Sequence, residues 1–397
     1  MLLFLFLFYL LQIQFQCLLS FQFLHITDIH LDLSYLPASA DNCMLRFTGM
    51  SCCHSFQISK SPYNIVDKWG SYTCDTPIDL LNSTFEELRH IVPPEQLDFI
   101  INTGDNADHH IITQNFRKNI QANRIVQQII SLWYPEVPII NVIGNHDTFP
   151  IDQTIPLYEN FIYKSLDSIW KTNSTTFTSG GFYLYERNYI CMFVVNSLYF
   201  DSNNFRYRIF NNTDFNQQFH WLDKTMQLCT EKNKKIWILN HEPPSSGFYK
   251  QEYFNILNKF KHSIIHQFFG HTHRDHFLVF YNQNNPIGSG FIAPSFLPDN
   301  HDPNFRLYSY NGTHIDNYNQ YHVNLMKTRM FNKSIIEKSY SFKDTYDISP
   351  TTQSFSHLLK NMQTNNTLFY HYCKHYIGHE LQHCNKHKLL SKSITSL

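Results

Sequence analysis

Five short apolar segments of the chain are each followed by a short polar motif. The segments cover residues 21–24, 99–101, 139–143, 236–239 and 264–269. The motifs after them are, in order, Asp28-Ile29-His30, Gly104-Asp105, Gly144-Asn145-His146-Asp147, Asn240-His241-Glu242 and Gly270-His271-Thr272-His273. Apolar runs of this length are typical of buried β-strands, and α/β sheets present ligands in the loops where such strands end. The pattern therefore predicts five ligand-presenting loops.

The segments between these motifs predict helices and hairpins. Helices are expected over residues 77–91, 113–132 and 214–229. On the first two, apolar residues recur on one face, namely Ile78, Leu81, Phe85 and Leu88, and then Phe116, Ile120, Ile125, Ile129 and Leu132. Hairpins are expected to turn at Arg187-Asn188 and at Asn311-Gly312. Alternating helices and strands followed by β-rich sequence predict an α/β fold, a two-sheet β-sandwich flanked by helices.

The pattern also divides the chain. Residues 33–76 form an irregular, cysteine-bearing insertion after the first motif. From about residue 326 the sequence becomes helical and polar. We therefore expect a catalytic domain over residues 21–325 and a small helical C-terminal subdomain over residues 326–397.

Composition excludes some functions. A hydrophobic content of 43% over 397 residues supports a large core. A net charge of −1 gives no basic surface for a nucleic-acid polymer. After the first few residues no segment is apolar enough to span a bilayer. We expect a monomer.

The amino terminus predicts secretion. Residues 1–11 are apolar apart from one tyrosine hydroxyl, and residues 17–20 offer small side chains for cleavage. We interpret residues 1–20 as a signal peptide, with an uncleaved anchor as the alternative because no positive charge precedes the apolar run. Asn-x-Ser/Thr sequons agree with an extracellular or lysosomal protein and occur at Asn82, Asn173, Asn211, Asn311, Asn332 and Asn365.

Cysteine usage points to the same compartment. Six cysteines lie in polar, loop-like sequence, which predicts disulfides in an oxidising environment: Cys43, Cys52, Cys53, Cys74, Cys373 and Cys384. Cys191 lies in a predicted strand and Cys229 in a predicted helix. We expect both to be buried thiols.

The motifs supply only oxygen and imidazole donors, which suit Zn²⁺, Mn²⁺ or Fe. Two ions held about 3.5–4 Å apart need a bridging ligand, and a carboxylate fits that role. Asp105 is the best candidate for it. The two-residue spacing of Asp28 and His30, and of His271 and His273, aims each pair at one ion. The neutral amide of Asn145 can ligate without repelling a phosphate.

Such a site hydrolyses phosphate esters: a hydroxide shared by the two ions attacks phosphorus in line. We assign His146 to leaving-group protonation or transition-state stabilisation, with Asp147 as a possible orienter. His109, four residues after Asp105, can also reach the phosphate. Each of these histidines alone is more often structural, and only the ordered set of motifs indicates a metal site.

The motif order resembles that of the calcineurin-like metallophosphoesterases, and closer matches resemble the acid sphingomyelinase-like phosphodiesterases. These matches lie at residues 69–75 (WGSYTCD), 104–109 (GDNADH), 241–244 (HEPP), 270–275 (GHTHRD), 291–295 (FIAPS) and 305–308 (FRLY). The resemblance covers about residues 22–325.

This resemblance implies a binuclear zinc site. Asp28, His30, Asp105 and His273 would hold one Zn²⁺, and Asp105, Asn145, His241 and His271 would hold the other. His109 and His146 match the active-site histidines of the family. The resemblance also implies the disulfide pairs Cys43–Cys52, Cys53–Cys74 and Cys373–Cys384. Asp108 stands where purple acid phosphatases carry a tyrosine, which argues against an iron–tyrosinate centre.

The expected substrate is a small-molecule or lipid phosphodiester. Acid sphingomyelinase carries a saposin-like domain ahead of its catalytic domain, whereas the first metal motif here begins at Asp28. The layout is closer to the sphingomyelinase-like phosphodiesterases, which act on soluble nucleotide or choline phosphodiesters, and sphingomyelin stays open. The alternatives are a phosphomonoesterase or nucleotidase of the same superfamily and a non-catalytic binding protein that retains the fold.

One further motif does not fit this chemistry. Residues 379–383 (HELQH) match the H-E-x-x-H pattern of zinc proteases. Gly378 weakens a continuous helix there, and only 14 residues follow His383 to supply a third ligand. The same four-residue spacing continues through His371, His375 and His387. We interpret the segment as part of a histidine-rich surface helix that gains charge at acidic pH, with adventitious metal binding as the alternative.

Overall fold

The computed structural model describes residues 20–42, 52–54, 65–110, 114–210, 213–244, 247–299, 301–377 and 385–396. Several predicted features lie outside these residues. They are the signal peptide apart from Ser20, Cys43, Cys384, the sequon at Asn211 and the H-E-x-x-H segment.

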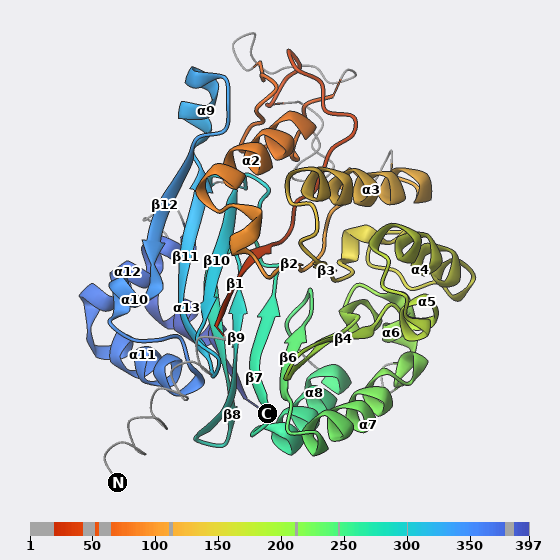
Figure 1. Ribbon diagram of the computed structural model, residues 1–397, viewed down its shortest axis with the longest axis vertical. Helices are drawn as coiled ribbons and strands as arrows, with labels where there is room; N and C mark the ends of the chain where they lie inside the picture. The colour runs from red at the N-terminus through yellow and green to blue at the C-terminus, as the bar shows by residue number, and fades with distance from the viewer. Residues whose placement is uncertain are drawn as a thin grey trace, which may run out of the picture.

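Two stacked sheets carry the fold (Figure 1). The first has the strand order β12-β11-β10-β1-β2-β3. Its strands are β1 (Phe21–Ile26), β2 (Phe99–Asn102), β3 (Ile139–Asn141), β10 (Asn304–Tyr310), β11 (Ile315–Val323) and β12 (Ile336–Ser341). Strands β1, β2 and β3 are parallel, and the other neighbours in this sheet are antiparallel.

The second sheet has the order β13-β8-β9-β7-β6-β5-β4. Its strands are β4 (Tyr183–Arg187), β5 (Ile190–Val194), β6 (Lys235–Leu239), β7 (Ile264–Phe269), β8 (His276–Asn282), β9 (Asn285–Ile292) and β13 (Ile394–Ser396). Strands β5, β6, β7 and β9 run parallel to one another. The α/β fold class and the two-sheet sandwich are therefore confirmed.

The main core lies between the sheets because side chains alternate along each strand. In β1, Phe23 faces the second sheet while Leu24 faces the outer helices. In β6, Trp237 faces the first sheet and Ile236 faces outward. The ring of Phe23 meets Trp237 of β6 at 5.3 Å and Phe268 of β7 at 5.6 Å between ring centroids. Aromatic contacts of this kind, together with the buried apolar area, hold the two sheets together.

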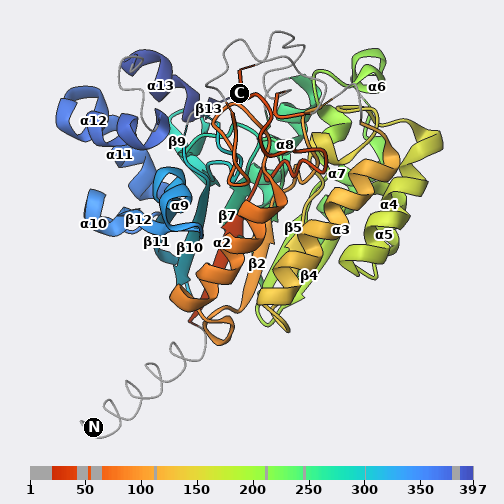
Figure 2. The same ribbon diagram turned by 90° about the horizontal axis from the view of Figure 1, so that it is seen from above.

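Helices cover both outer faces. Helices α2 (Ile78–Ile91) and α3 (Phe116–Trp133) pack on the first sheet, and α7 (Gln218–Glu231) and α8 (Gly247–Phe260) pack on the second. Figure 2 shows α2, α3 and α4 (Pro156–Trp170) side by side in one layer. The short α5 (Thr175–Gly180) follows α4 and packs against it.

Most predicted elements are present, with differences at their ends. Ile78 is 44% exposed and Leu132 is 64% exposed. Each lies at the end of its helix, beyond the sheet that the other apolar residues cover. The predicted start of a helix at Asp214 is wrong: α7 begins at Gln218, and the Asp214 carboxylate accepts the backbone N–H of Phe219 at 2.9 Å. The hairpin of β4 and β5 and that of β10 and β11 are confirmed.

The expectation of free thiols at Cys191 and Cys229 is wrong. The two residues form a disulfide between β5 and α7, with their Cα atoms 6.5 Å apart. Both residues face the outer core of the second sheet, where α7 crosses β5, and this crossing is a tertiary contact that neither local sequence reveals.

The other predicted disulfides lie partly within the described residues. The pair Cys53–Cys74 is confirmed. Cys52 and Cys373 are also disulfide-bonded, and the partners predicted for them lie outside the described residues.

The chain after residue 325 is mainly helical, with α9 (Leu325–Phe331), α10 (Phe342–Tyr346), α11 (Thr352–Thr364), α12 (Asn366–Ile377) and α13 (Lys386–Lys392). It also adds β12 to one sheet and β13 to the other. On α11, Phe355 stacks on Phe277 of β8 at 4.2 Å and belongs to the main core. The division of the chain near residue 325 stays a prediction.

One histidine of this region differs from the expected surface helix. His375 on α12 stacks on Tyr340 at 3.8 Å between ring centroids, and burial lowers its pKa to about 4. Within the described residues, no helix is long and apolar enough to cross a membrane.

The disulfide between β5 and α7 generates a stability prediction. We expect the Cys191→Ala/Cys229→Ala variant to lose about 2–4 kcal/mol of unfolding free energy, because the unfolded chain is no longer closed over a separation of 38 residues. Thermal and denaturant unfolding of the metal-loaded protein measure this loss. Wild-type protein treated with reductant is the parallel sample, and an unchanged midpoint in both samples would contradict the disulfide.

Candidate metal centre

Five parallel strands deliver the predicted motifs to one edge of the sandwich. The loops follow β1, β2 and β3 of the first sheet and β6 and β7 of the second. Five of the seven predicted ligands have positive φ, a conformation that is uncommon outside glycine: Asp28 (50°), His30 (47°), Asp105 (58°), His271 (67°) and His273 (57°). Such local strain persists only where the surrounding structure enforces it, and it clusters at functional sites.

The loops are held to one another by backbone hydrogen bonds. The N–H groups of Asp28 and His30 donate to the carbonyls of Gly104 and Asp105, each at 2.9 Å. The N–H of His271 donates to the Asp28 carboxylate at 3.0 and 3.1 Å. The loops after β1, β2 and β7 therefore form one body at the edge of the two sheets.

A first group of side chains contains Asp28, His30 and His273. The Nε2 atoms of His30 and His273 lie 3.3 Å apart, and His273 Nε2 lies 3.5 Å from Asp28 Oδ1. One donor atom from each residue lies within 4.8 Å of the others. Atoms bound about 2.0–2.1 Å from one Zn²⁺ stand roughly 3 Å apart, so this spacing fits a shared cation.

A second group contains Asp105, Asn145, His241 and His271. The Asn145 amide oxygen lies 2.9 Å from His241 Nε2 and 3.2 Å from His271 Nδ1. His241 Nε2 lies 3.2 Å from Asp105 Oδ2. These nitrogen and oxygen donors suit a borderline metal such as Zn²⁺.

Asp105 lies between the two groups. Its Oδ2 atom is 3.2 Å from His241 and 3.6 Å from His30 Nε2, while Oδ1 accepts the backbone N–H of His146 at 2.8 Å. The side chain is 2% exposed. Burial opposes ionisation, yet the neighbouring His241 holds the pKa of Asp105 well below its usual range. The structure therefore brings all seven predicted ligands together, with the predicted bridging carboxylate in the middle.

The electrostatics of the two groups favour cations. Burial opposes the charge on His241, but Asp105 outweighs it and raises the pKa of His241 to about 10. Burial likewise opposes the charge on His273, and hydrogen bonds to Asp28 and Asp299 raise its pKa to about 9. Carboxylates that hold protons on neighbouring histidines so firmly also hold metal ions, whose binding displaces those protons.

Backbone carbonyls orient two of the histidines. His30 Nδ1 donates to the Ala107 carbonyl at 3.0 Å, and His241 Nδ1 donates to the Thr103 carbonyl at 2.8 Å. A carbonyl can only accept, so each bond fixes the tautomer and leaves Nε2 free for a ligand. Both carbonyls belong to the loop that carries Asp105, so one loop aligns ligands from two other strands.

Two motif glycines are required by close approach. A Cβ on Gly144 would lie 2.1 Å from Asp105 Oδ1, and a Cβ on Gly270 would lie 2.1 Å from Thr27 Oγ1 and 2.6 Å from Asp28 Oδ2. These backbone segments press directly against the ligand carboxylates. Any larger residue would displace the carboxylates.

His109 and His146 lie beside the first group. The His109 ring stacks on His30 at 3.7 Å and meets the edge of His146 at 4.4 Å between ring centroids. His146 Nδ1 lies 3.2 Å from the Asp108 carbonyl. Burial lowers the pKa of His109 to about 4. Both rings therefore lie beside the predicted ligands, and their catalytic role stays a prediction.

The prediction that Asp147 orients the ring of His146 is wrong. The Asp147 carboxylate accepts the backbone N–H groups of Gly144, Asp105 and Asn106 at 2.9–3.0 Å and the Asn123 amide at 3.0 Å. Asp147 therefore fixes the loops after β2 and β3 and does not orient the ring of His146. The position of Asp147 directly after Asn145 and His146 in the sequence did not indicate that it binds backbone groups of two loops.

Sequence reasoning missed three further carboxylates around the site. Asp75 Oδ1 lies 2.7 Å from His109 Nδ1, Asp152 Oδ1 accepts the Asn145 amide at 2.8 Å, and Asp299 Oδ2 lies 3.6 Å from His273 Nδ1. Each is an ordinary aspartate in irregular sequence. Only Asp75 carried a signal, as the last residue of a family-like motif.

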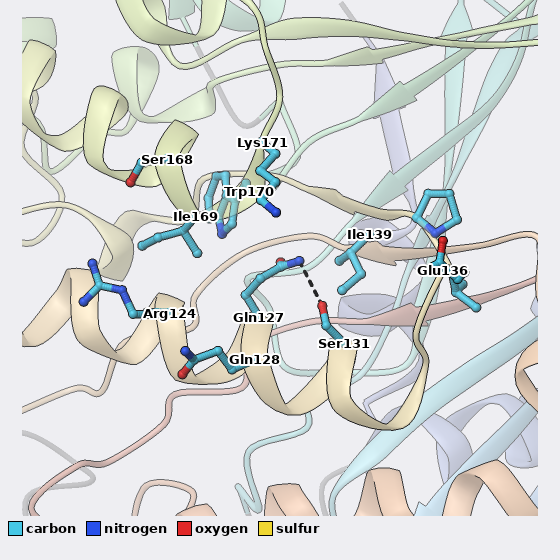
Figure 3. A pocket seen from close by; sticks show the side chains of 12 residues that line it. Arg124, Gln127, Gln128, Ser131, Glu136, Ile139, Ser168, Ile169, Trp170 and Lys171 are labelled. Carbon is cyan, nitrogen blue, oxygen red and sulfur yellow. Dashed lines mark hydrogen bonds between the residues drawn. The ribbon is translucent and has the colours of Figure 1, made fainter.

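A hollow of about 710 Å³ lies away from this centre (Figure 3). Its lining includes Arg124 and Gln127 on α3, Ile139 at the start of β3, and Trp170 and Lys171 at the end of α4. None of the predicted ligands or catalytic histidines lines it. We therefore assign it no part in the chemistry.

Comparison with known proteins agrees with the geometry. A family model described as calcineurin-like phosphoesterase matches residues 21–275. Sphingomyelin phosphodiesterase A of Dictyostelium discoideum is 30% identical over 88% of this chain and 61% of its own length. Sphingomyelinase phosphodiesterase C of the same organism is 28% identical over 88% of this chain and 84% of its own. The cyclic GMP-AMP phosphodiesterase of Homo sapiens is 27% identical over 82% of this chain and 76% of its own.

The donor set generates a metal-binding prediction. We expect two equivalents of divalent metal per chain, measured by plasma mass spectrometry after dialysis against zinc. His241→Ala should bind one equivalent or less, because it removes a donor beside the shared carboxylate. His266→Ala is the matched control, since His266 is buried between the sheets and accepts the Ile315 N–H at 3.1 Å. Equal metal loss in the two variants, at equal thermal stability, would contradict the assignment.

Proposed function

Because the chain belongs to the calcineurin-like phosphoesterase family, whose fold implies a binuclear metal site, we propose that it is a metal-dependent phosphodiester hydrolase of the acid sphingomyelinase-like type. The observation that carries this proposal is the buried Asp105 carboxylate between two groups of oxygen and imidazole donors. Loss of even one ligand would argue for a non-catalytic descendant of the fold, and all seven are present.

We propose two Zn²⁺ ions as the cofactor. Asp28, His30, Asp105 and His273 would hold one ion, and Asp105, Asn145, His241 and His271 the other. Four imidazoles among seven ligands favour zinc over magnesium or calcium. Such a pair, when bound, supplies an activated water and neutralises charge on the phosphoryl oxygens.

The protein's own residues would then position and protonate the substrate. His109 and His146 lie together beside the ligands, so both rings would lie next to a phosphate bound there. His146, whose backbone N–H donates to Asp105 Oδ1, would donate a proton to the leaving alcohol. Asn145 adds a ligand without a negative charge, which avoids repulsion of an anionic diester.

The proposed substrates are phosphodiesters of the choline or nucleotide class, in small-molecule or lipid form. Two relatives are named for sphingomyelin and one for cyclic GMP-AMP, and all three names describe diester cleavage. The reaction common to these names is therefore the basis of the proposal, and the identity of the alcohol is a matter for experiment.

We also propose that the protein works in an oxidising compartment, either outside the cell or in a lysosome-like lumen. The disulfides Cys53–Cys74 and Cys191–Cys229 support this, because disulfides persist in secreted proteins and are rare in the cytosol. The sequons at Asn173, Asn332 and Asn365 lie on exposed residues and are accessible to glycosylation.

The first test compares a diester with a monoester. We expect bis-p-nitrophenyl phosphate to be hydrolysed faster than p-nitrophenyl phosphate, with activity lost to a chelator and restored by zinc. Asp105→Asn should lower kcat about 10³-fold, because the metal pair contributes several kcal/mol to the barrier. A faster monoester would favour the nucleotidase alternative, and an unchanged Asp105→Asn rate would favour a non-catalytic protein.

A second experiment identifies the leaving alcohol. The wild-type protein and Asp105→Asn are assayed with zinc at acidic and neutral pH on sphingomyelin micelles, CDP-choline, ATP and a cyclic dinucleotide. We expect at least one diester to be cleaved by the wild-type protein at a rate that Asp105→Asn lacks. Cleavage of none of them, with metal fully bound, would contradict the proposed substrate class.

A further inference from the structure

We propose that Asp75 is a positioning residue that fixes the ring of His109 over the reaction site, and that the Cys53–Cys74 disulfide holds Asp75 in place. The inference rests on the proposed function and adds to it, since it assigns a catalytic task to the irregular insertion. Asp75 touches no predicted metal ligand through its side chain, so its action on the reaction would pass through His109.

The carboxylate of Asp75 holds His109 at two points. Oδ1 lies 2.7 Å from the ring Nδ1, and Oδ2 accepts the backbone N–H of the same residue at 2.8 Å. Asp75 is 1% exposed, whereas the His109 side chain is 20% exposed. One buried carboxylate therefore fixes both the backbone and the ring of a histidine that is partly exposed.

This contact engages Nδ1 of His109 in a hydrogen bond with Asp75. Whichever partner carries the proton, Nδ1 of His109 is bound to Asp75, and Nε2 is the nitrogen left for a phosphate or an alcohol. The ring is also packed between neighbours, at 3.7 Å from His30 and 4.4 Å from His146 between centroids. Stacking alone would allow the imidazole to flip by 180°, and the hydrogen bond to Asp75 selects one of the two orientations.

Asp75 reaches this place through a short backbone ladder. The Thr76 N–H donates to the His30 carbonyl at 3.0 Å, and the Asp32 N–H donates to the Thr76 carbonyl at 2.9 Å. Leu31 forms an isolated bridge with Thr76 on one side and with Ala107 on the other. The insertion thereby adds a third segment beside the loops that carry His30 and Asp105.

The disulfide ties this segment to its surroundings. Cys74 directly precedes Asp75, and its partner Cys53 directly precedes His54, whose Nε2 lies 2.7 Å from Asp32 Oδ2. Cys53, Cys74 and His54 are all buried. The disulfide and the contact of His54 with Asp32 therefore hold the segment that carries Asp75 beside the loop after β1.

A double-mutant cycle tests the proposal on the zinc-loaded protein with bis-p-nitrophenyl phosphate. We expect Asp75→Asn to lower kcat about 10–100-fold with KM within about twofold and metal content unchanged, because general acid–base catalysis contributes about 10²–10⁴-fold. His109→Ala should lower kcat by at least as much. The double variant should be no slower than His109→Ala, because Asp75 acts only through that residue.

Asp167→Asn is the matched control. Its carboxylate accepts hydrogen bonds from Thr172 and Asn173 at the end of α4, so it reports the general effect of an aspartate-to-asparagine change. We expect its kcat to equal that of the wild-type protein. A folded Asp75→Asn with wild-type kcat, or a double variant slowed by the product of the two single effects, would overturn the proposal.

The disulfide variant tests the same idea without changing the carboxylate. Cys53→Ser/Cys74→Ser should lower kcat at unchanged metal content, whereas Cys191→Ala/Cys229→Ala should lower stability alone. If Asp75→Asn does not fold, the Cys53→Ser/Cys74→Ser variant provides the test in its place. Wild-type kcat in Cys53→Ser/Cys74→Ser would overturn the part assigned to the disulfide.

A readout without turnover separates this inference from the proposed function. In protein labelled with ¹⁵N-histidine, the His109 ring resonances, assigned by their absence in His109→Ala, should shift in Asp75→Asn and stay in place in Asp167→Asn. If the wild-type protein cleaves no phosphodiester, the proposed function fails while this shift still tests the positioning. Unshifted His109 resonances in Asp75→Asn would overturn the positioning itself.

Discussion

The buried carboxylate of Asp105 is the constraint on which the arrangement of the loops depends. An aspartate with 2% exposure is costly to keep charged unless cations or hydrogen-bond donors surround it. His241 and the backbone of His146 supply part of that compensation, and a metal pair would supply the rest. The strands β1, β2, β3, β6 and β7 must therefore end at one level, so that residues from both sheets reach the same carboxylate.

The loop after β2 organises the site beyond its own ligand. Its carbonyls orient His30 and His241, its backbone N–H groups bind Asp147, and it pairs with the loop after β1. Geometry at a metal centre depends on such outer contacts nearly as much as on the ligands. Here they are mostly backbone groups, which every residue type offers. Backbone groups of this loop can therefore orient the ligand side chains with few additional polar side chains.

The disulfides Cys53–Cys74 and Cys191–Cys229 stabilise different parts of the molecule, the first near the candidate site and the second in the scaffold. Cys191–Cys229 joins strand β5 to helix α7 in the outer core of the second sheet. Cys53–Cys74 lies beside residues that lead to His109. The sandwich itself rests on aromatic side chains packed between the sheets, such as Phe23 against Trp237. The candidate site thus lies on a hydrophobic scaffold, and the irregular insertion adds Asp75 beside His109.

The sequence by itself predicted the five strands that precede the motifs, helices α2 and α3 and the set of seven candidate ligands, because these features are encoded locally. An apolar run followed by Asp-x-His or Gly-Asp identifies both a strand and the loop at its end. Only the tertiary structure decided which distant groups meet. It paired Cys191 with Cys229, turned Asp147 toward the backbone, placed Asp75 on His109 and merged β12 and β13 into the sheets. Such partners depend on how helices cross strands and on where an irregular insertion returns, and no short stretch of sequence carries that information.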